Sequence, residues 1–282
     1  MNLYDYNTIN KILTKHGFTF SKALGQNFLI NPEVCPAMAN SLGADSQTGV
    51  LEIGPGIGVL TKELCAVAGK VVTIELDKRL FPVLDETLCG CDNLEIVEGD
   101  ALKLDLNALI KDKFSGMKSV KICANLPYYI TSPIIMKLLE SRLSIDTIVV
   151  MVQKEAADRL TSAVGSRNCG ALTVAANYYA ETEKLFDVGK ESFMPSPKVD
   201  SAVIKFSIRK TPAVSVQNEE HFFKIVKAAF SQRRKTAVNC LSAALTVTKA
   251  EVLDALAEIG KGEKDRAETF TMEDFGRLSQ LL

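Results

Sequence analysis

Short apolar runs alternate with longer stretches in which apolar residues recur every three or four positions. The runs are rich in β-branched residues and only four or five residues long, which is typical of buried strands. They predict strands at residues 50–53, 71–74, 94–97, 120–123 and 148–152. Helical spacing follows them, at 59–68, 78–88 and 132–140. Strands that alternate with helices at this spacing indicate βαβ units around a parallel sheet, an α/β fold.

The pattern changes toward the C-terminus. Residues near 185–187 and 202–208 predict two further strands at one edge of the sheet, and a polar connector containing proline follows at 210–218. Beyond it only helical spacing remains, at 219–231, 236–245, 248–259 and 272–282. We therefore predict an α/β domain over residues 1–209 and a small all-helical domain over residues 210–282, with an uncertainty of several residues at the boundary.

Composition narrows the class of protein. The 282 residues are 47% hydrophobic and 24% charged, which are globular proportions and exclude wholesale disorder. No apolar run approaches the roughly 18 residues that a membrane-spanning helix needs. The N-terminus lacks the basic start and apolar stretch of a signal peptide. These features predict a cytoplasmic protein with no membrane association.

Cysteine and histidine give little support for a metal site or a disulfide scaffold. Seven cysteines are scattered without a C-x-x-C pair, and the two histidines, His16 and His221, are far apart in the sequence. Structural zinc sites have closer and more regular ligand spacing. We expect reduced thiols and no bound metal.

Charge is balanced overall but unevenly distributed. The net charge is −1, yet residues 203–240 carry eight cations against Glu219 and Glu220, so this segment is +6 and the remainder −7. Nucleic-acid binding follows the local field rather than the sum. A solvated helix face is the ordinary explanation for so short a charged run, and a phosphate-binding surface is the alternative.

A glycine-rich turn follows the first predicted strand. Glu52-Ile-Gly54-Pro-Gly56-Ile-Gly58 has the spacing G-x-G-x-G, whereas a dinucleotide site would have its third glycine where this chain has Val59. Glycines there let a ligand approach main-chain amides at a helix N-terminus. The spacing favours a ligand without a pyrophosphate, and a purely structural turn is the alternative.

Two acids end the next two strands. Glu75 lies 21 residues after Gly54, where a carboxylate can accept two hydrogen bonds from a ribose diol. Asp100, in Glu98-Gly-Asp-Ala101, could accept a hydrogen bond from an adenine amino group, although a turn aspartate without a ligand is the alternative. Strand ends of an open parallel sheet line one crevice. The turn and the two acids together predict an adenosine site.

The tetrapeptide Asn125-Leu126-Pro127-Tyr128 follows the fourth strand. Pro127 cannot continue the sheet, so the chain leaves it here with exposed carbonyls. An asparagine side-chain oxygen and a neighbouring carbonyl can both accept hydrogen bonds from one exocyclic amine, which turns the nitrogen lone pair toward an electrophile. The adjacent aromatic ring offers a stacking surface for a base. Alone the tetrapeptide is an ordinary turn; after an adenosine site it predicts methylation of an amino nitrogen.

The chain resembles the ribosomal RNA adenine dimethyltransferase family, whose members use S-adenosylmethionine to dimethylate two adjacent adenines near the 3′ end of small-subunit (16S) RNA. The matching motifs cover most of the chain. They are Lys22-Ala-Leu-Gly-Gln-Asn-Phe-Leu29, Leu51-Glu-Ile-Gly-Pro-Gly-Ile-Gly58, Ile74-Glu-Leu-Asp77, Glu98-Gly-Asp-Ala101, Asn125-Leu-Pro-Tyr128, Phe193-Met-Pro-Ser-Pro-Lys-Val199 and Phe230-Ser-Gln-Arg-Arg-Lys235. The resemblance implies a Rossmann-like class I methyltransferase fold and an enzyme that modifies RNA in the small ribosomal subunit.

The resemblance also implies a role for each matching residue. The cofactor-binding residues would be Asn27, Leu29, Gly54, Gly56, Glu75, Asp100, Ala101 and Asn125. The residues at the target adenine would be Asn125, Leu126, Pro127, Tyr128 and Phe193, with the rings of Tyr128 and Phe193 on either side of a flipped base. The basic segment then becomes a phosphate-binding surface, chiefly through Arg233, Arg234 and Lys235.

Three other functions stay open at this stage. One is the related enzyme that methylates a large-subunit adenine and confers macrolide resistance. Another is an assembly factor that binds immature small subunits, with catalysis secondary or absent. The third is a methyltransferase for a small molecule or a protein, which would make the basic segment incidental. For the small-subunit enzyme we expect a monomer.

Overall fold

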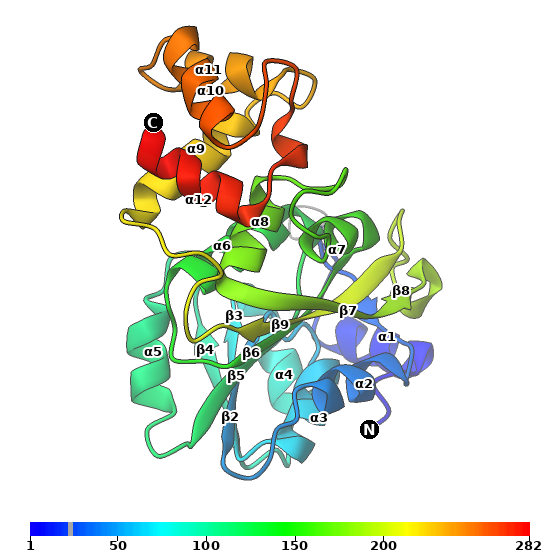
Figure 1. The fold of residues 1–282 in the computed structure, drawn as a ribbon. Helices are drawn as coiled ribbons and strands as arrows, with labels where there is room; N and C mark the ends of the chain where they lie inside the picture. Colours follow the sequence, from blue (N-terminus) through cyan, green and yellow to red (C-terminus); the bar gives the residue numbers. More distant parts are fainter. Residues whose placement is uncertain (22–24) are drawn as a thin grey trace. The chain divides into compact units, whose positions relative to one another are not determined.

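The computed structural model describes residues 1–21 and 25–282 (Figure 1). Lys22–Leu24, which begin the first family motif, lie outside the described residues. The chain forms two compact units, one of residues 1–157 with 183–208 and the other of residues 158–182 with 209–282.

The first unit contains a seven-stranded sheet in the order β4-β3-β2-β5-β6-β9-β7. The pairs β2–β3, β2–β5, β3–β4 and β5–β6 are parallel, and β9 is antiparallel to β6. Each of the five apolar runs forms a strand, and the two additional strands lie at one edge, so these sequence predictions are confirmed. The strands are β2 (Thr48–Ile53), β3 (Lys70–Glu75), β4 (Leu94–Glu98), β5 (Ser119–Asn125), β6 (Thr147–Gln153), β7 (Ala180–Val188) and β9 (Ser201–Ile208).

One face of the sheet packs against the helices α1 to α4. Val50 and Val71 of the sheet belong to the same buried cluster as Ile9, Met38 and Leu64 of those helices. Successive strand residues point to opposite faces, so the other face must be covered separately. The helices of this unit are α1 (Tyr6–Lys15), α2 (Val34–Ser41), α3 (Val59–Val67), α4 (Phe81–Thr87), α5 (Leu106–Lys113) and α6 (Thr131–Glu140), and α7 (Lys154–Leu160) lies across the division between the units.

The residues on the opposite face of β2 are also buried. Leu51 is fully buried and lies outside the first cluster. Gly49, on the same side of the strand, packs so tightly against the ring of Phe114 that a Cβ at this position would lie 2.3 Å from the ring. Phe114 follows the last residue of α5, so that helix is packed against this face. Burial on both faces explains why the parallel strands are continuous apolar runs rather than alternating ones.

A second sheet of two short strands was not predicted from the sequence. β1 (Phe28–Leu29) pairs antiparallel with β8 (Phe193–Met194), and Leu29 lies directly opposite Phe193. Two residues are too few to give a periodic signal. This pairing brings an N-terminal motif to the same place in the fold as the distant motif that begins at Phe193.

The second unit is helical. It contains α8 (Ala171–Tyr179), α9 (Glu219–Ala229), α10 (Ala237–Ala244), α11 (Lys249–Glu258) and α12 (Met272–Leu281). Residues 158–182 were expected in the sheet domain, whereas by contacts they group with the helices. The Tyr178 ring stacks on Phe222 of α9, with centroids 5.0 Å apart. Such a long-range aromatic contact leaves no local sequence signal.

Among residues 1–21 and 25–282, none of the helices combines the length and the apolar character that crossing a membrane requires.

Candidate active site

A cleft opens at the carboxyl end of the parallel strands in the first unit. Its empty volume is about 1120 Å³, including the open space at its mouth. Strand register explains its position, because Glu75 at the end of β3 pairs with Glu98 of β4 and Asn125 at the end of β5 pairs with Met151 of β6. Residues that follow these strands therefore meet at one edge. All residues that the sequence assigned to the cofactor and to the target line this cleft: Asn27, Leu29, Gly54, Gly56, Glu75, Asp100, Ala101, Asn125, Leu126, Pro127, Tyr128 and Phe193.

The glycine turn forms the floor of the cleft between β2 and α3. Gly54 has a φ of +72°, in the left-handed region that favours glycine. A Cβ on Gly54 would meet no atom within 4 Å, so the space in front of it is open. Gly56 also has a positive φ, and a Cβ there would approach the Phe28 ring to 3.2 Å. The turn thus leaves room for a ligand at Gly54 and is tightly packed at Gly56.

Glu75 presents a buried carboxylate to the cleft. It is only 6% exposed, and its Oε1 accepts a hydrogen bond from the Asp77 backbone N–H at 2.7 Å. Burial raises the pKa of Glu75 above its ordinary value. A buried acid that still has acceptor capacity suits the two hydroxyl groups of a ribose, because hydrogen bonds from them would compensate its lost hydration.

Asp100 follows β4 by two residues and is shaped by its own turn. Its Oδ1 accepts a hydrogen bond from the Leu102 backbone N–H at 2.9 Å, and its Oδ2 lies 3.7 Å from the Lys103 ammonium group. Asp100 therefore has the local turn role that was its alternative explanation. It also lines the cleft, together with Ala101. The carboxylate keeps lone pairs for a ligand amino group, so the two roles are compatible.

Asn125 is the last residue of β5, and no described residue is bonded to its side chain. Within the described part of the chain its amide makes no hydrogen bond, and the Leu126 carbonyl accepts none, whereas the Leu126 N–H donates to Met151 O at 3.1 Å. Pro127 ends the strand pairing and precedes a short 3₁₀ turn, Tyr128–Ile130. The Asn125 amide oxygen and the Leu126 carbonyl are thus available, next to an open cleft, to accept hydrogen bonds from the two N–H groups of an amine.

The two aromatic residues of the target side come from distant parts of the chain. Tyr128 follows Pro127, and its hydroxyl shares a hydrogen bond of 2.7 Å with Ser201 Oγ on β9. Phe193 is 4% exposed and lies on β8, held opposite Leu29. Both rings line the cleft. Tyr128 is held through its hydroxyl and Phe193 through the strand pairing of β8, which suits a stacking surface for a flat group.

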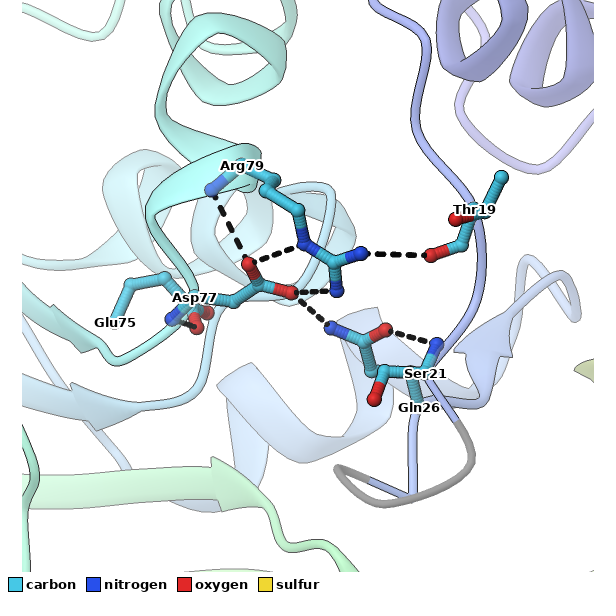
Figure 2. A network of polar contacts seen from close by, with 6 residues as sticks. All are labelled: Thr19, Ser21, Gln26, Glu75, Asp77 and Arg79. Carbon is cyan, nitrogen blue, oxygen red and sulfur yellow. Dashed lines mark hydrogen bonds and ion pairs between the residues drawn. The ribbon is translucent and has the colours of Figure 1, made fainter.

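The N-terminal segment forms another wall. Asn27 and Leu29 line the cleft as the resemblance implied, and Asn27 Nδ2 donates to the Gly25 carbonyl at 3.1 Å. Gln26 also lines the cleft, although no role was assigned to it from the sequence. Its amide donates to the Asp77 carboxylate at 2.9 Å (Figure 2).

Glu52 lies near the carboxyl end of β2, but it is buried in the protein interior and does not line the cleft. It lies on β2, is fully buried, and accepts a hydrogen bond from Thr61 Oγ1 at 2.7 Å. Its other oxygen has no partner among the described residues, and burial raises the pKa of this carboxyl to about 7. Thr73 on β3 pairs in register with Glu52.

The basic residues predicted for RNA lie in the second unit. Arg233, Arg234 and Lys235 are exposed between α9 and α10, and none of the three forms an ion pair with a described carboxylate. The +6 segment as a whole is not one surface. Lys205 lies on β9 in the first unit, and Arg209 is paired with Glu181 at 3.1 Å.

Several residues in or next to the cleft were not predicted from the sequence. Ser201 anchors Tyr128 from 73 positions away, so no local pattern could have indicated it. Tyr129 lines the cleft and is 55% exposed, an unusual state for a large aromatic side chain that only the structure reveals. Gln26 and Asp77 stand inside the motifs quoted above, and their contact joins two motifs that are 51 residues apart.

A model of the ribosomal RNA adenine dimethylase family matches residues 17–282. Ribosomal RNA small subunit methyltransferase A of Bacillus pumilus is 46% identical over 275 residues, which is 96% of this chain and 94% of that protein. The protein of the same name from Clostridioides difficile is 44% identical over 280 residues, covering 99% of this chain and 96% of its own length.

Solved structures of similar fold also include RNA-modifying methyltransferases. A dimethyladenosine transferase from Plasmodium falciparum superimposes with a TM-score of 0.73 and 30% identity, over 89% of this chain and 95% of that chain. The 23S rRNA methyltransferase ErmE gives a TM-score of 0.68 and 29% identity, over 90% and 99% of the two chains. The fold is thus the Rossmann-like fold of class I methyltransferases, as the resemblance implied. Because the family model covers all but the first residues, the chain belongs to the ribosomal RNA adenine dimethylase family.

Proposed function

We propose that this protein transfers methyl groups from S-adenosylmethionine to the N6 atoms of two adjacent adenines near the 3′ end of 16S ribosomal RNA, giving N6,N6-dimethyladenines. The observation that carries the proposal is that one cleft is lined by Gly54, Glu75 and Asp100 on one side and by Asn125, Tyr128 and Phe193 on the other. An adenosine site beside a free pair of acceptors is the arrangement that methylation of a base amine requires.

The residues on the first side fit S-adenosylmethionine. Open space at Gly54 suits the amino-acid end, the buried Glu75 carboxylate suits the ribose hydroxyls, and Asp100 suits the adenine amino group. Asn27, Leu29, Gly56 and Ala101 would complete the walls. When bound, the donor supplies an electrophilic methyl group on its sulfonium. No metal is needed for this chemistry.

The residues on the second side suit an adenine that has left its helix. Asn125 Oδ1 and the Leu126 carbonyl would each accept a hydrogen bond from the N6 amine, which would hold the nitrogen lone pair out of conjugation and toward the methyl group. Tyr128 and Phe193 would stack on the two faces of the base, offsetting the few kcal/mol that extruding it costs. The amine is neutral when it attacks and loses its proton afterwards, so no strong general base is required.

The basic residues of the second unit suit the RNA backbone. Arg233, Arg234 and Lys235 are exposed and unpaired within the described chain, so binding a phosphate would break no existing ion pair. Phosphate contacts position an RNA without reading its sequence. The choice of adenines would then depend on the shape of the small subunit. We also propose that the protein acts as a monomer in the cytoplasm and contributes to small-subunit biogenesis.

The similarity to 23S rRNA methyltransferase ErmE makes a large-subunit adenine the second candidate target. The test is to incubate purified protein and S-adenosylmethionine with each ribosomal subunit from cells that lack the protein, and to map methylated nucleotides by mass. We expect two adjacent dimethyladenines near the 3′ end of the small-subunit RNA. Methylation confined to the large subunit would support the second candidate. Binding to small subunits without methylation would support the assembly-factor alternative.

A further inference from the structure

Asp77 is a mostly buried carboxylate two residues beyond Glu75, and it faces a guanidinium group (Figure 2). Arg79 Nε donates to Asp77 Oδ1 at 2.8 Å and Arg79 Nη2 to Oδ2 at 2.6 Å. The Arg79 backbone N–H also donates to Oδ1, at 3.1 Å. This fork of two parallel bonds fixes the plane of the carboxylate as well as its position. Hydrogen bonding from Arg79 lowers the pKa of Asp77, so the group stays ionised.

Asp77 contacts two walls of the cleft at once. Its backbone N–H donates to Glu75 Oε1 at 2.7 Å, which orients the acid proposed to hold the ribose. Its Oδ2 accepts from Gln26 Nε2 at 2.9 Å, and Gln26 belongs to the N-terminal wall. Gln26 Oε1 in turn accepts from the Ser21 backbone N–H at 2.9 Å. One carboxylate thus connects the end of β3 to the segment that carries Asn27 and Leu29.

Arg79 adds further contacts to the same segment. Its Nη1 donates to the Thr19 carbonyl at 3.3 Å, and its guanidinium carbon lies 5.1 Å from the centre of the Phe18 ring. Phe18 in turn lies beside Phe28, with ring centroids 6.1 Å apart. Phe28 packs against Gly56 of the glycine turn. The segment is therefore fixed to the cleft by polar bonds at Asp77 and by aromatic contacts at the turn.

We propose that Asp77 and Arg79 are positioning residues for the methyl donor: together they hold Glu75 and the N-terminal wall in the arrangement that binds S-adenosylmethionine. The inference rests on the proposed function, because it assumes that this cleft takes that donor. Neither side chain belongs to the target side of the cleft. Asp77 and Arg79 therefore act on donor binding. Because this binding energy is the same in the ground state and the transition state, its loss raises KM for the donor and leaves kcat unchanged.

The first test is Arg79→Ala, which removes the fork on Asp77 and the bond to Thr19. We expect the dissociation constant for S-adenosylmethionine, measured by titration calorimetry, to rise about tenfold, as for the loss of a charge-assisted hydrogen-bond pair. At saturating donor, kcat should stay within about twofold of wild type. Arg79→Lys, which keeps the charge but not the fork, should restore only part of the affinity.

The matched control is Lys78→Ala. Lys78 is the neighbouring residue on the same 3₁₀ turn and forms an ion pair of 2.6 Å with Glu98, outside the network. Its loss should leave the dissociation constant within about twofold, because exposed ion pairs contribute little. Thermal unfolding of every variant shows whether it is folded at the temperature of the assay.

The second test begins with a variant that leaves Arg79 intact. Gln26→Ala removes the bond to Asp77 and leaves the Asp77–Arg79 fork in place. It should weaken donor binding several-fold, and combining it with Arg79→Ala should cost less than the sum of the two, since both act through Asp77. Unchanged donor affinity in both single variants, a fall in kcat alone, or full additivity would each overturn the inference. Failure of the wild-type protein to bind the donor would instead overturn the proposed function.

Discussion

The cleft of the first unit and residues 233–235 of the second differ in how their polar groups are held. In the cleft, Glu75 and Asp77 are almost fully buried and each accepts hydrogen bonds from named partners. Arg233, Arg234 and Lys235 are exposed, and no carboxylate of the described chain fixes them. Methyl transfer needs fixed geometry, because the lone pair of the target amine must point at the methyl carbon of the donor. A cation near a phosphate needs no fixed rotamer, because its electrostatic attraction extends over a Debye length. Changes in the cleft should therefore alter the reaction, and changes in the segment should alter salt dependence.

The sharpest test of this contrast is Asn125→Ala. We expect methylation of small subunits to fall about a thousandfold, comparable to losing a preorganised hydrogen-bonding group in an active site. Binding to the subunits should stay within about twofold, because phosphate contacts supply most of the affinity. Labelled methyl transfer and a filter-binding assay measure the two effects. Asn107→Ala, which changes an exposed asparagine on α5, is the control. Methylation near the wild-type rate would refute the role of Asn125.

The buried carboxyl of Glu52 predicts that the free energy of unfolding depends on pH. The pKa of Glu52 in the folded chain is about 7, against 4.5 ordinarily, so the folded state binds more protons between these values. The free energy of unfolding therefore falls as pH rises through this window, by up to roughly 3 kcal/mol.

Glu52→Gln removes this titration. The amide keeps an acceptor for Thr61, and its NH₂ group would take the place of the oxygen that has no partner among the described residues. We expect wild type to lose thermal stability from pH 5 to pH 8 and the variant to lose much less. Thermal unfolding of both proteins at the two pH values checks this, and parallel pH profiles would contradict it.

The basic segment gives the complementary prediction. Arg233→Glu combined with Arg234→Glu should weaken RNA binding about tenfold or more at low salt and reduce the slope of log affinity against log salt by about 2, since each lost phosphate contact changes the slope by nearly one. Methyl transfer at saturating RNA should change little. Lys249→Glu with Lys264→Glu makes the same charge change outside the segment and should leave the slope nearly unaltered. An unchanged slope in the first variant would place the RNA surface elsewhere.

The smallest effect concerns the anchor of one stacking ring. Tyr128→Phe removes the hydrogen bond to Ser201 but keeps the ring, so KM for RNA should rise only a few-fold, as expected for about 1 kcal/mol. Ser201→Ala should have a similar effect, and the double variant should be no worse than either one. If the two effects simply add, this bond does not position the ring.

Most of the first unit could be predicted from the sequence because its signals are local. A buried strand such as β6 is a continuous apolar run, and the turn at Gly54 has its own spacing. The pairing of β1 with β8 could not be predicted, because two residues carry no periodicity. Residues 158–182 were placed in the sheet domain by pattern, whereas by contacts they group with the helices, through interactions such as the stacking of Tyr178 on Phe222 that carry no local signal.

The sequence by itself determined which chemical groups this protein has and the order in which they follow the strands. Glu75, Asp100 and Asn125 each come at or just after a strand end, and the parallel topology requires those ends to meet at one edge. Only the tertiary structure decided how the groups are held. The fork of Arg79 on Asp77 and the bond from Ser201 to Tyr128 join residues whose contact depends on side-chain packing. The periodicity of apolar residues determines where the strands lie. A hydrogen bond between side chains forms only where the folded chain brings a donor and an acceptor within about 3 Å of each other.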